Sequence, residues 1–420
     1  MEIINLFKEA FYKAVDRAMP ENVLPEYFPP LPKGRLIVVG AGKAAADMAR
    51  VAENHYGPEN LEGMVITRYG HAVKTQKIKV IEASHPVPDQ AGFEASKQLI
   101  ELCQNLSEDD LVLFLLSGGG SALFTQPDGI SLAEKTELNS LLLKSGASID
   151  EMNTVRKQFS KVKGGRFAEL VLPAKIVSLI ISDVVADDLS VVASGPTIYD
   201  EATNQDAIKV LFKYGIYDDV YLDALEGDDA RELYAVPDFL KHIDFRLENH
   251  LIASNQQSLE AVQEYFAKQG ISSYILSSTI EGEAREAAKF QAAIVRQIIE
   301  YNQPFSKPCV LISGGETTVT VKKKGKGGRN SEFLLALALE LSDYDNISAF
   351  AADTDGIDGS EDNAGAFYKS EFKNKLSKDK MLEYLDNNDS YSYFKRVGGL
   401  FVSGPTRTNV NDLRLIFVSD

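Results

Sequence analysis

The sequence has few of the residues and segments that define several common protein classes. It contains only two cysteines, Cys103 and Cys309, far apart in apolar surroundings. This usage favours free buried thiols in a reducing compartment over a disulfide framework. The histidines show no metal-binding spacing, and the longest apolar runs are too short to cross a membrane. We therefore expect a cytoplasmic protein.

Positive charge is also scarce. The 61 Asp and Glu residues outnumber the 44 Lys and Arg residues, and the formal net charge is −17. Nucleic acids are bound by basic surfaces, so this balance argues against a nucleic-acid partner. At 420 residues, the chain is long enough for two or three domains with ample cores.

Three widespread catalytic motifs are absent from the sequence. There is no Gly-x-x-x-x-Gly-Lys-Ser/Thr phosphate-binding loop and no protein-kinase motif set. Ser121 does not belong to a Gly-x-Ser-x-Gly nucleophile elbow, because Leu123 occupies the position of the second glycine. These absences argue against a P-loop enzyme, a protein kinase and a serine hydrolase.

Short apolar segments alternate with helical patterns along the chain. In the N-terminal half, the segments that we interpret as strands are 35–39, 64–67, 79–83, 111–116 and 176–181. A similar alternation resumes after residue 250. This order predicts an α/β fold, with a mostly parallel sheet and helices on both faces in the N-terminal half and a second α/β region after residue 250. The acidic stretch 201–245 has few strand signals, so we expect one domain at 1–245 and another at 246–420.

One basic, glycine-rich stretch lies near the C-terminal end of this acidic chain. It combines Ser313-Gly314-Gly315-Glu316-Thr317-Thr318 with Lys322-Lys323-Lys324-Gly325-Lys326-Gly327-Gly328-Arg329-Asn330. Glycine lets the backbone approach a ligand closely, while lysine and arginine supply positive charge. We expect the lysines to lie on a hairpin and the stretch to bind a phosphate. The candidate binding residues are Gly314, Gly315, Glu316, Thr317 and Asn330.

A second glycine-rich loop follows the first predicted strand. The pattern Gly40-x-Gly42-x-x-Ala45 fits a loose dinucleotide-binding motif, and Lys43 within it adds charge to an anion site. Arg68 stands where an acidic residue is usual, which weakens NAD binding and would suit NADP. The alternative for Lys43 is a solvated side chain at a tight turn.

A third loop has the sequence Ser117-Gly118-Gly119-Gly120-Ser121, and also follows a predicted strand. Its successive N–H groups favour a backbone nest that binds an anion. The alternative is close packing of a strand against a helix, which requires small residues. Because ligands bind at the carboxyl ends of strands in α/β sheets, several such loops indicate a polar cleft built from both domains.

Other polar residues extend these candidate sites. Asn153 and Arg156 precede Lys161-x-Lys163-Gly164-Gly165-Arg166, which forms a second basic patch or, alternatively, a solvated helix face. Carboxylates at strand ends hold Mg²⁺ through one or two direct bonds. The candidate metal ligands are Asp183, Asp353 and Asp355. Capping a helix or turn is the alternative role for each of these aspartates.

Two sets of motifs, one in each half of the chain, occur in a recognisable order. The C-terminal set comprises Gly327-Gly328-Arg329-Asn330-x-Glu332 and Asp353-Thr354-Asp355-Gly356-Ile357-Asp358-Gly359. The N-terminal set includes Gly40-Ala41-Gly42-Lys43-Ala44, His85-Pro86-Val87-Pro88-Asp89 and Ser194-Gly195-Pro196-Thr197. Over nearly its whole length the chain resembles the glycerate 2-kinases, with their MOFRL region at about 307–415.

The resemblance implies a specific reaction and architecture. The reaction transfers the γ-phosphoryl group of ATP to the 2-hydroxyl of D-glycerate, with Mg²⁺ or another divalent cation. The architecture is a Rossmann-like three-layer N-terminal domain and a smaller α/β C-terminal domain, with the active site in the cleft. The family's proposed active-site lysine and arginine fall on Lys43 and Arg329. We expect Asp187 to accept the hydroxyl proton. The expected partners are D-glycerate and ATP, with no membrane; the oligomeric state, a homodimer included, stays open.

Three residues depart from the family pattern, since Ser84, Ala186 and Arg407 stand where glycine is usual. Two other functions also stay open. An NAD(P)H-dependent hydroxypyruvate reductase would use the loop at Gly40 as a dinucleotide site, and some family members carry that label. A non-catalytic metabolite sensor on the same fold is the third hypothesis, although the retained Lys43 and Arg329 argue against it.

Overall fold

The computed structural model describes residues 3–226 and 246–420 and divides the chain into two compact units. The N-terminal unit is Val23–Ile252, and the C-terminal unit combines Met1–Asn22 with Ala253–Asp420. Both units are α/β, as predicted. Their boundaries differ from the expected 1–245 and 246–420, because the first helix belongs with the C-terminal unit. The last strand before the boundary also completes the sheet of the N-terminal unit.

The N-terminal unit is built on a six-stranded sheet in the order β3-β2-β1-β4-β5-β6, the strand order typical of Rossmann folds. The pairings of β1 with β2 and β4, of β2 with β3, and of β4 with β5 are all parallel, as predicted. The strands are β1 (Leu36–Ala41), β2 (Glu62–Arg68), β3 (Lys79–Ala83), β4 (Leu111–Leu116), β5 (Lys175–Ile181) and β6 (Leu247–Ala253).

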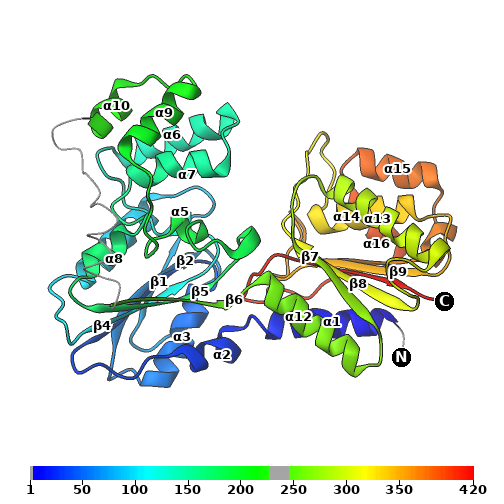
Figure 1. The fold of residues 1–420 in the computed structure, drawn as a ribbon, viewed down its shortest axis with the longest axis horizontal. Coiled ribbons are helices and arrows are strands. Elements are labelled where there is room, and N and C mark those ends of the chain that lie inside the picture. The colour runs from blue at the N-terminus through cyan, green and yellow to red at the C-terminus, as the bar shows by residue number, and fades with distance from the viewer. Residues whose placement is uncertain (1–2, 227–245) are drawn as a thin grey trace. The chain divides into compact units, whose positions relative to one another are not determined.

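Helices cover both faces of this sheet, with α3 on one face and α5 and α8 on the other (Figure 1). Alternate residues of the central strands, such as Ile37 and Phe114, enter a core shared with α4 and α8. The helices α6, α7, α9 and α10 form a separate apolar cluster. The helices are α3 (Ala45–Tyr56), α4 (Gln90–Leu102), α5 (Gly120–Leu123), α6 (Leu132–Ser145), α7 (Ile149–Gln158), α8 (Arg166–Val171), α9 (Asn204–Lys213) and α10 (Asp219–Glu226). The short helix α2 (Pro20–Val23) spans the boundary between the two units in the sequence. The rest of the predicted stretch 201–245 lies outside the described residues.

The C-terminal unit has a six-stranded sheet in the order β11-β10-β9-β12-β8-β7. Only the β7–β8 pair is parallel among its pairings, and the other four are antiparallel. The predicted second α/β region is confirmed, but its sheet is mostly antiparallel, unlike that of the N-terminal unit. One reason is the connection from β9 to β10, which contains no crossover helix and returns the chain antiparallel. The strands are β7 (Ser273–Ile280), β8 (Cys309–Gly315), β9 (Ile347–Asp353), β10 (Gly365–Lys369), β11 (Leu400–Phe401) and β12 (Asp412–Val418).

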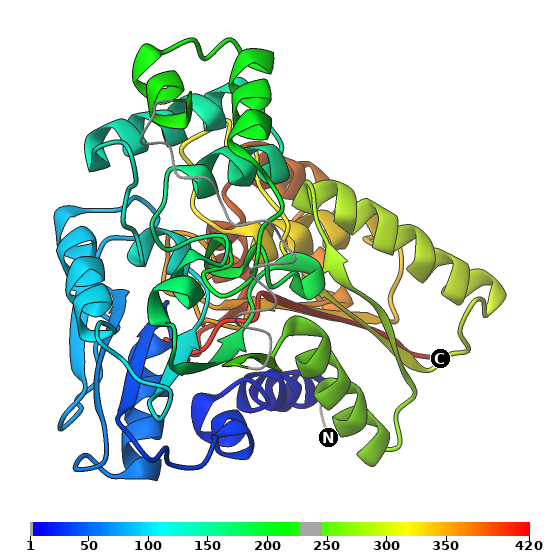
Figure 2. The ribbon, with the colours of Figure 1, turned by 60° about the vertical axis from the view of Figure 1, so that its left-hand side comes forward.

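Two helix layers enclose the second sheet, and Figures 1 and 2 show α1 and α12 side by side on one face. The alternation along β8 explains both layers: Val310 and Ile312 pack with α1 and α12, whereas Leu311 packs with α13 and α14. The helices are α1 (Ile3–Asp16), α12 (Asn255–Lys268), α13 (Ala284–Tyr301), α14 (Arg329–Glu340), α15 (Lys378–Asp386) and α16 (Ser390–Val397).

The opening helix α1 joins the C-terminal unit through its apolar stripe. Phe7 and Phe11 are fully buried and lie edge-on or tilted against Phe350 of β9, and Phe11 also contacts Phe401 of β11. Burying aromatic side chains of this size contributes strongly to a core. This contact explains why a helix at the start of the sequence does not belong to the N-terminal domain that we expected.

Three smaller findings complete the fold. Cys103 and Cys309 are free and buried, as expected. Within 3–226 and 246–420, the helices are too short or too polar to cross a membrane. The hairpin that we predicted around the lysine-rich stretch is wrong, since the chain between β8 and α14 has no paired strands. Its one bridge joins Thr318 to Glu283.

Candidate functional site

Lys43 lies at the carboxyl end of β1, between β1 and β4. This is the point where strand order reverses and where ligands bind in such sheets. The Lys43 N–H donates to the carbonyl of Gly118 at 2.8 Å, and the Ala44 N–H donates to Oγ of Ser117 at 3.0 Å. The glycine-rich loops after β1 and β4 are therefore tied together. The Lys43 ammonium has no ion pair within the described part of the chain.

The glycines of the first loop are needed for this close approach. A Cβ on Gly40 would lie 2.4 Å from the carbonyl oxygen of Leu115, and one on Gly42 would lie 2.1 Å from Oγ of Ser117. Gly42 also has a φ of 138°, which L side chains rarely adopt. Packing between β1 and β4 thus accounts for both glycines, and Ser117 acts as a buried support for the Lys43 loop.

The loop after β4 brings further polar groups to the same edge of the sheet. A Cβ on Gly118 would lie 1.8 Å from Oδ2 of Asp183, so this carboxylate occupies the space that the glycine leaves free. Gly119 has a φ of 84° and lies beside the His85 ring and the Lys43 side chain. Gly120 packs against Ala193. The structure therefore groups Lys43, Asp183 and His85 around this loop.

Asp187 follows β5 in a sharp turn whose residues Ala186 and Asp187 have φ values of 64° and 56°. The left-handed conformation at Ala186 occurs where the family usually has glycine. Asp187 is half-buried but does not line the pocket described next. Its predicted role as a proton acceptor therefore stays a prediction.

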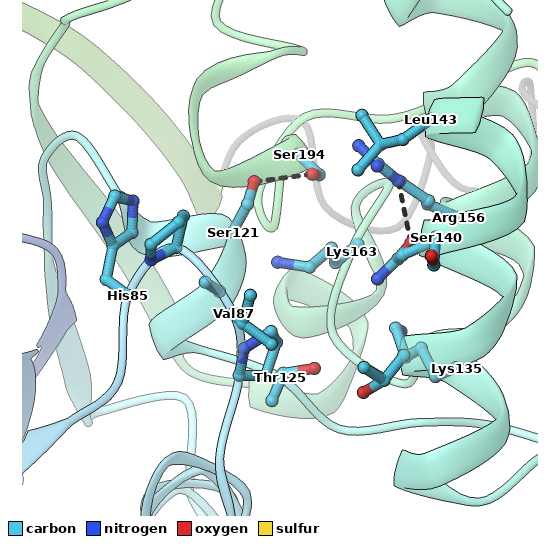
Figure 3. A pocket seen from close by; sticks show the side chains of 16 residues that line it. His85, Val87, Ser121, Thr125, Lys135, Ser140, Leu143, Arg156, Lys163 and Ser194 are labelled. Carbon is cyan, nitrogen blue, oxygen red and sulfur yellow. Dashed lines mark hydrogen bonds between the residues drawn. The ribbon is translucent and has the colours of Figure 1, made fainter. Parts of the chain in front are cut away.

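A cavity of about 450 Å³ opens beside the loop after β4 (Figure 3). Its lining includes His85, Gly119, Ser121 and Ser194. A hydrogen bond of 2.8 Å joins the Oγ atoms of Ser121 and Ser194. Its lining also includes Thr125, Lys135, Arg156 and Lys163. We refer to it as the basic pocket, because no carboxylate occurs among the described residues that line it.

Burial and mutual repulsion shape the charges of the basic pocket. The pKa of Lys135 falls to about 7, through burial first and then through the positive charge of Arg166 and Arg156. Burial lowers the pKa of Lys163 well below its usual value, with further repulsion from Lys135, Arg156 and Lys157. The pKa of His85 falls to about 4 through burial and the nearby charge of Lys43, so its imidazole is neutral at pH 7.

Hydrogen bonds hold the three pocket cations in place. Nζ of Lys163 donates to the carbonyls of Phe124 and Ala193, at 3.1 Å and 2.9 Å, and Nζ of Lys135 donates to the carbonyl of Phe159 at 2.6 Å. Nε of Arg156 donates to Oδ1 of Asn139 at 2.8 Å. Each cation therefore keeps donors for a ligand, since an ammonium has three N–H groups and a guanidinium five.

The predicted basic patch thus divides into ligand-facing and structural residues. Arg156 lines the pocket, whereas Asn153 is buried outside its lining. Lys157 pairs with Asp200 at 2.8 Å, and buried Arg166 donates to backbone carbonyls of Lys157, Gln158 and Ser160. Sequence reasoning missed Lys135, which stands alone on α6 without a motif to indicate it. Lys163 was part of the patch but was not selected.

In the C-terminal unit, Arg329 begins α14 and is surrounded by carboxylates. Its Nε donates to Oδ1 of Asp412 at 2.8 Å, Nη2 to Oδ2 of Asp353 at 2.8 Å, and Nη1 to Oε1 of Glu316 at 3.1 Å. Burial opposes the charge of Arg329, but the three carboxylates outweigh it and raise the pKa further. Two of its five N–H groups stay available for a ligand.

Asp412 is the centre of this network, and sequence reasoning missed it. It is fully buried and also accepts hydrogen bonds from Nδ2 of Asn330, at 2.6 Å, and from Arg414. The backbone N–H groups of Asn330 and Ser331 donate to buried Asp358 at 2.9 Å and 2.8 Å, which caps α14. The motif around Asp358 therefore positions the first turn that carries Arg329.

The other predicted phosphate-binding residues of this stretch are held by internal contacts. A Cβ on Gly314 would lie 1.9 Å from Oδ1 of Asn255, and one on Gly315 would lie 2.3 Å from the backbone of Ile280. Oγ1 of buried Thr317 accepts from Nη2 of Arg414 at 2.9 Å. The side chains of Lys322, Lys323 and Lys324 are exposed. Arg329, which is half-buried, is therefore the least exposed cation of this stretch.

The donor set does not form a built-in metal centre. Among the described residues, no cluster of three or more His, Cys, Asp or Glu side chains is arranged for a metal ion. Asp353 already accepts a hydrogen bond from Arg329. Burial nevertheless raises the pKa of Asp353 well above its usual value. The backbone N–H of Ile357 donates to Asp355 at 2.9 Å, as in a turn. Asp353 and Asp355 thus fit a structural role better than a resident metal site.

These features define an α/β protein with glycine-rich, basic strand ends, an arrangement that suits small anions. Comparisons with known proteins make the class specific. Residues 6–226 match a domain of unknown function, DUF4147, and residues 309–412 match the MOFRL family. The D-glycerate 2-kinase of Thermotoga maritima is 42% identical over 96% of each chain. The glycerate 2-kinase of Pyrococcus horikoshii is 42% identical over 92% of this chain and 88% of its own length.

Structural and further sequence comparisons agree. The crystal structure of glycerate kinase from Thermotoga maritima matches with a TM-score of 0.89 and 41% identity over 99% of both chains. A protein of Agrobacterium vitis named putative hydroxypyruvate reductase is 42% identical over 98% of this chain and 94% of its own length. The chain belongs to the glycerate 2-kinase family.

Proposed function

We propose that this chain is an ATP-dependent D-glycerate 2-kinase, which forms 2-phosphoglycerate and ADP. The observation that carries the proposal is the position of Lys43, at the switch point of the first sheet and beside the basic pocket. The match to kinases of this name over nearly the full chain supports it. Phosphoryl transfer depends mainly on positioning and on neutralising charge, which these cations supply.

Lys43 and Arg329 are the proposed catalytic cations. Lys43 lacks an ion pair in the described ranges, so its ammonium can donate to a phosphoryl oxygen without breaking an internal contact. Arg329 is fixed by three carboxylates and would use its two remaining N–H groups. Such fixed donors stabilise charge that develops in a transition state.

A proton acceptor for the substrate hydroxyl is the next requirement. Asp187 is the candidate from the sequence, and Asp183 lies closer to the loop after β4, as its position beside Gly118 indicates. We assign no step to a protein-held metal, because the donor set does not form one. In the proposal, Mg²⁺ enters as the counter-ion of ATP phosphates, as is common for kinases.

The alternative function is an NAD(P)H-dependent hydroxypyruvate reductase. One structural observation, the position of the Gly40 loop, favours this alternative. The Gly40 loop sits at the Rossmann switch point, where dinucleotides bind, although Arg68 ends β2 in place of an acidic residue.

The proposed setting is the cytoplasm, since the two cysteines are free thiols. A homodimer is an oligomeric state to be checked by light scattering.

The test measures two activities of the full-length chain. We expect ADP formation that requires ATP, D-glycerate and Mg²⁺ together, and no oxidation of NADH or NADPH with hydroxypyruvate. Reductase activity without glycerate-dependent ADP formation would reject the proposal. ADP formation that does not depend on glycerate would indicate an ATPase or a different acceptor.

A further inference from the structure

We propose that the basic pocket binds the carboxylate of the acceptor, so that Lys135, Arg156 and Lys163 select 2-hydroxy acids. This assignment rests on the proposed kinase function and names the residues that hold one of its two substrates. The pocket lies wholly within the N-terminal unit. Three observations support the assignment: the burial of like charges, the unused hydrogen-bond donors, and the position of the pocket beside Lys43.

The first observation is the charge of the pocket. Lys135 and Lys163 are 5% and 3% exposed, and the described lining has no carboxylate to neutralise them or Arg156. Burying like charges costs free energy, because each loses its hydration and repels the others, and Asp128, outside the lining, only partly offsets this at Lys135. An anion in the pocket would relieve that cost. This arrangement is expected of a site shaped for an anionic ligand.

The second observation is the set of polar groups that point into the pocket. Figure 3 shows the Lys163 side chain extending into it between Ser121 and Thr125. Oγ1 of Thr125 is buried without a hydrogen-bond partner in the structure, although buried hydroxyl groups are normally paired. Arg156 uses only Nε among its donors within the described ranges. A carboxylate with a neighbouring hydroxyl would satisfy several of these groups together.

The third observation distinguishes the acceptor from the nucleotide. Gly119 lines the pocket and also lies beside Lys43, the proposed phosphoryl-binding lysine. In a 2-hydroxy acid, the carboxylate is bonded to the same carbon that carries the reacting hydroxyl. An acid whose carboxylate is held beside Gly119 therefore keeps that hydroxyl within the neighbourhood of Lys43. A cavity of about 450 Å³ also leaves room for acids longer than three carbons.

Binding is measured by calorimetry on the full-length chain, with D-glycerate, glycolate, inorganic phosphate and ATP each added alone. We expect Arg156→Gln and Lys135→Gln to weaken D-glycerate and glycolate about 10- to 100-fold, the scale of a lost charged hydrogen bond. Both variants should leave ATP affinity unchanged. Lys144→Gln is the matched control, because Lys144 is an exposed lysine on the same helix as Lys135. Arg156→Lys, which keeps the charge, should restore part of the affinity.

A proton-linked readout separates a ligand contact from a structural effect. Lys135, whose pKa is about 7, faces Arg166, Asp128, Arg156 and Lys163. A bound anion favours its charged form, so binding at about pH 8 should take up protons, as shown by calorimetry in two buffers of different ionisation enthalpy. Lys135→Gln should reduce this uptake, and circular dichroism verifies that each variant is folded.

The outcomes separate failure of the pocket from failure of the kinase proposal. Loss of ATP affinity with unchanged D-glycerate affinity would overturn the assignment in favour of the nucleotide. Phosphate binding that depends on Arg156, with no carboxylate bound, would overturn it as well. If 2-hydroxy acids bind through Arg156 but glycerate is not phosphorylated, the assignment of the pocket is supported and the kinase proposal is rejected. If glycerate is phosphorylated with an unchanged KM in Arg156→Gln, the pocket fails and the kinase proposal stands.

Discussion

The basic pocket of the N-terminal unit and the Arg329 cluster of the C-terminal unit differ in how their positive charge is balanced. The pocket gathers Lys135, Arg156 and Lys163 with no lining carboxylate among the described residues, so its charge is left for a ligand. Arg329 instead contacts Asp412, Asp353 and Glu316, so its charge is neutralised within the protein. Both regions place cations near predicted ligand loops, but in the pocket burial and mutual repulsion disfavour the charged lysines until an anion binds.

The comparison teaches that a run of positive residues in a sequence does not reveal which charges a ligand will meet. The lysine-rich run 322–326 is the densest in the sequence, yet its side chains are exposed. Lys135 belongs to no basic run and is buried beside the cavity. Burial and the absence of internal partners identify a ligand-facing cation better than local charge density does.

The largest effect is expected for Arg329→Ala. Its loss leaves buried Asp353 and Asp412 without their cation, so we expect stability to fall by about 3 kcal/mol. Turnover should also fall at least about 100-fold, the scale of one lost transition-state donor. Urea unfolding and ADP release measure the two effects. The control is Lys326→Ala, which removes an exposed lysine from the same loop. Near-normal turnover in folded Arg329→Ala would refute the catalytic role.

Lys43→Ala should separate catalysis from stability. Lys43 has no ion pair in the described ranges, so we expect little change in the unfolding midpoint. Turnover should still drop at least about 100-fold, because a positioned phosphoryl-binding donor is lost. The measurement is kcat at saturating ATP and D-glycerate. If Lys43→Ala destabilised the protein as much as Arg329→Ala does, the proposed contrast between the two cations would be wrong.

The pH dependence of stability should report the uncompensated charge of the basic pocket. The pKa of Lys135 is about 7 in the folded protein against 10.5 as its ordinary value, so the unfolded chain binds more protons between these values. The penalty for burying the charge is full below pH 7, and stability should rise with pH up to about 10.5, by at most about 1.4 kcal/mol per pH unit. Lys163 contributes with the same sign.

Urea titrations of the wild type and Lys135→Met, from about pH 7 to pH 10, check this slope. The rise should be smaller in Lys135→Met and unchanged in Lys144→Met. An equal rise in the free energy of unfolding in all three proteins would mean that burying the charged form of Lys135 does not destabilise the folded protein.

The smallest effects are expected at two departures from the family pattern, one in each unit. Ala186 and Arg407 have φ values of 64° and 69°, where glycine is less strained. We expect Ala186→Gly and Arg407→Gly each to raise stability by about 0.5–1 kcal/mol, after the greater flexibility of glycine in the unfolded chain is subtracted. Ser84→Gly is the control, since Ser84 is not among the described residues with positive φ. A gain for Ser84→Gly alone would contradict the argument.

The sequence predicted the N-terminal sheet and its glycine loops well, because buried strands alternate with helices and end in distinctive turns. It did not predict the mixed second sheet, since nothing local reveals that β12 inserts antiparallel between β8 and β9. Motifs led to Lys43 and Arg329. Asp412 and Lys135 were missed because their importance comes from contacts across many residues, such as the bond from Arg329 to Asp412.

The most direct test of the account is ³¹P NMR of the products formed from ATP and D-glycerate. We predict 2-phosphoglycerate and ADP from the wild-type chain, and neither above background from folded Lys43→Ala at equal concentration. 3-Phosphoglycerate as the main product would contradict the proposed acceptor hydroxyl. No phosphorylated glycerate from the wild type, together with oxidation of NADH by hydroxypyruvate, would contradict the kinase function itself.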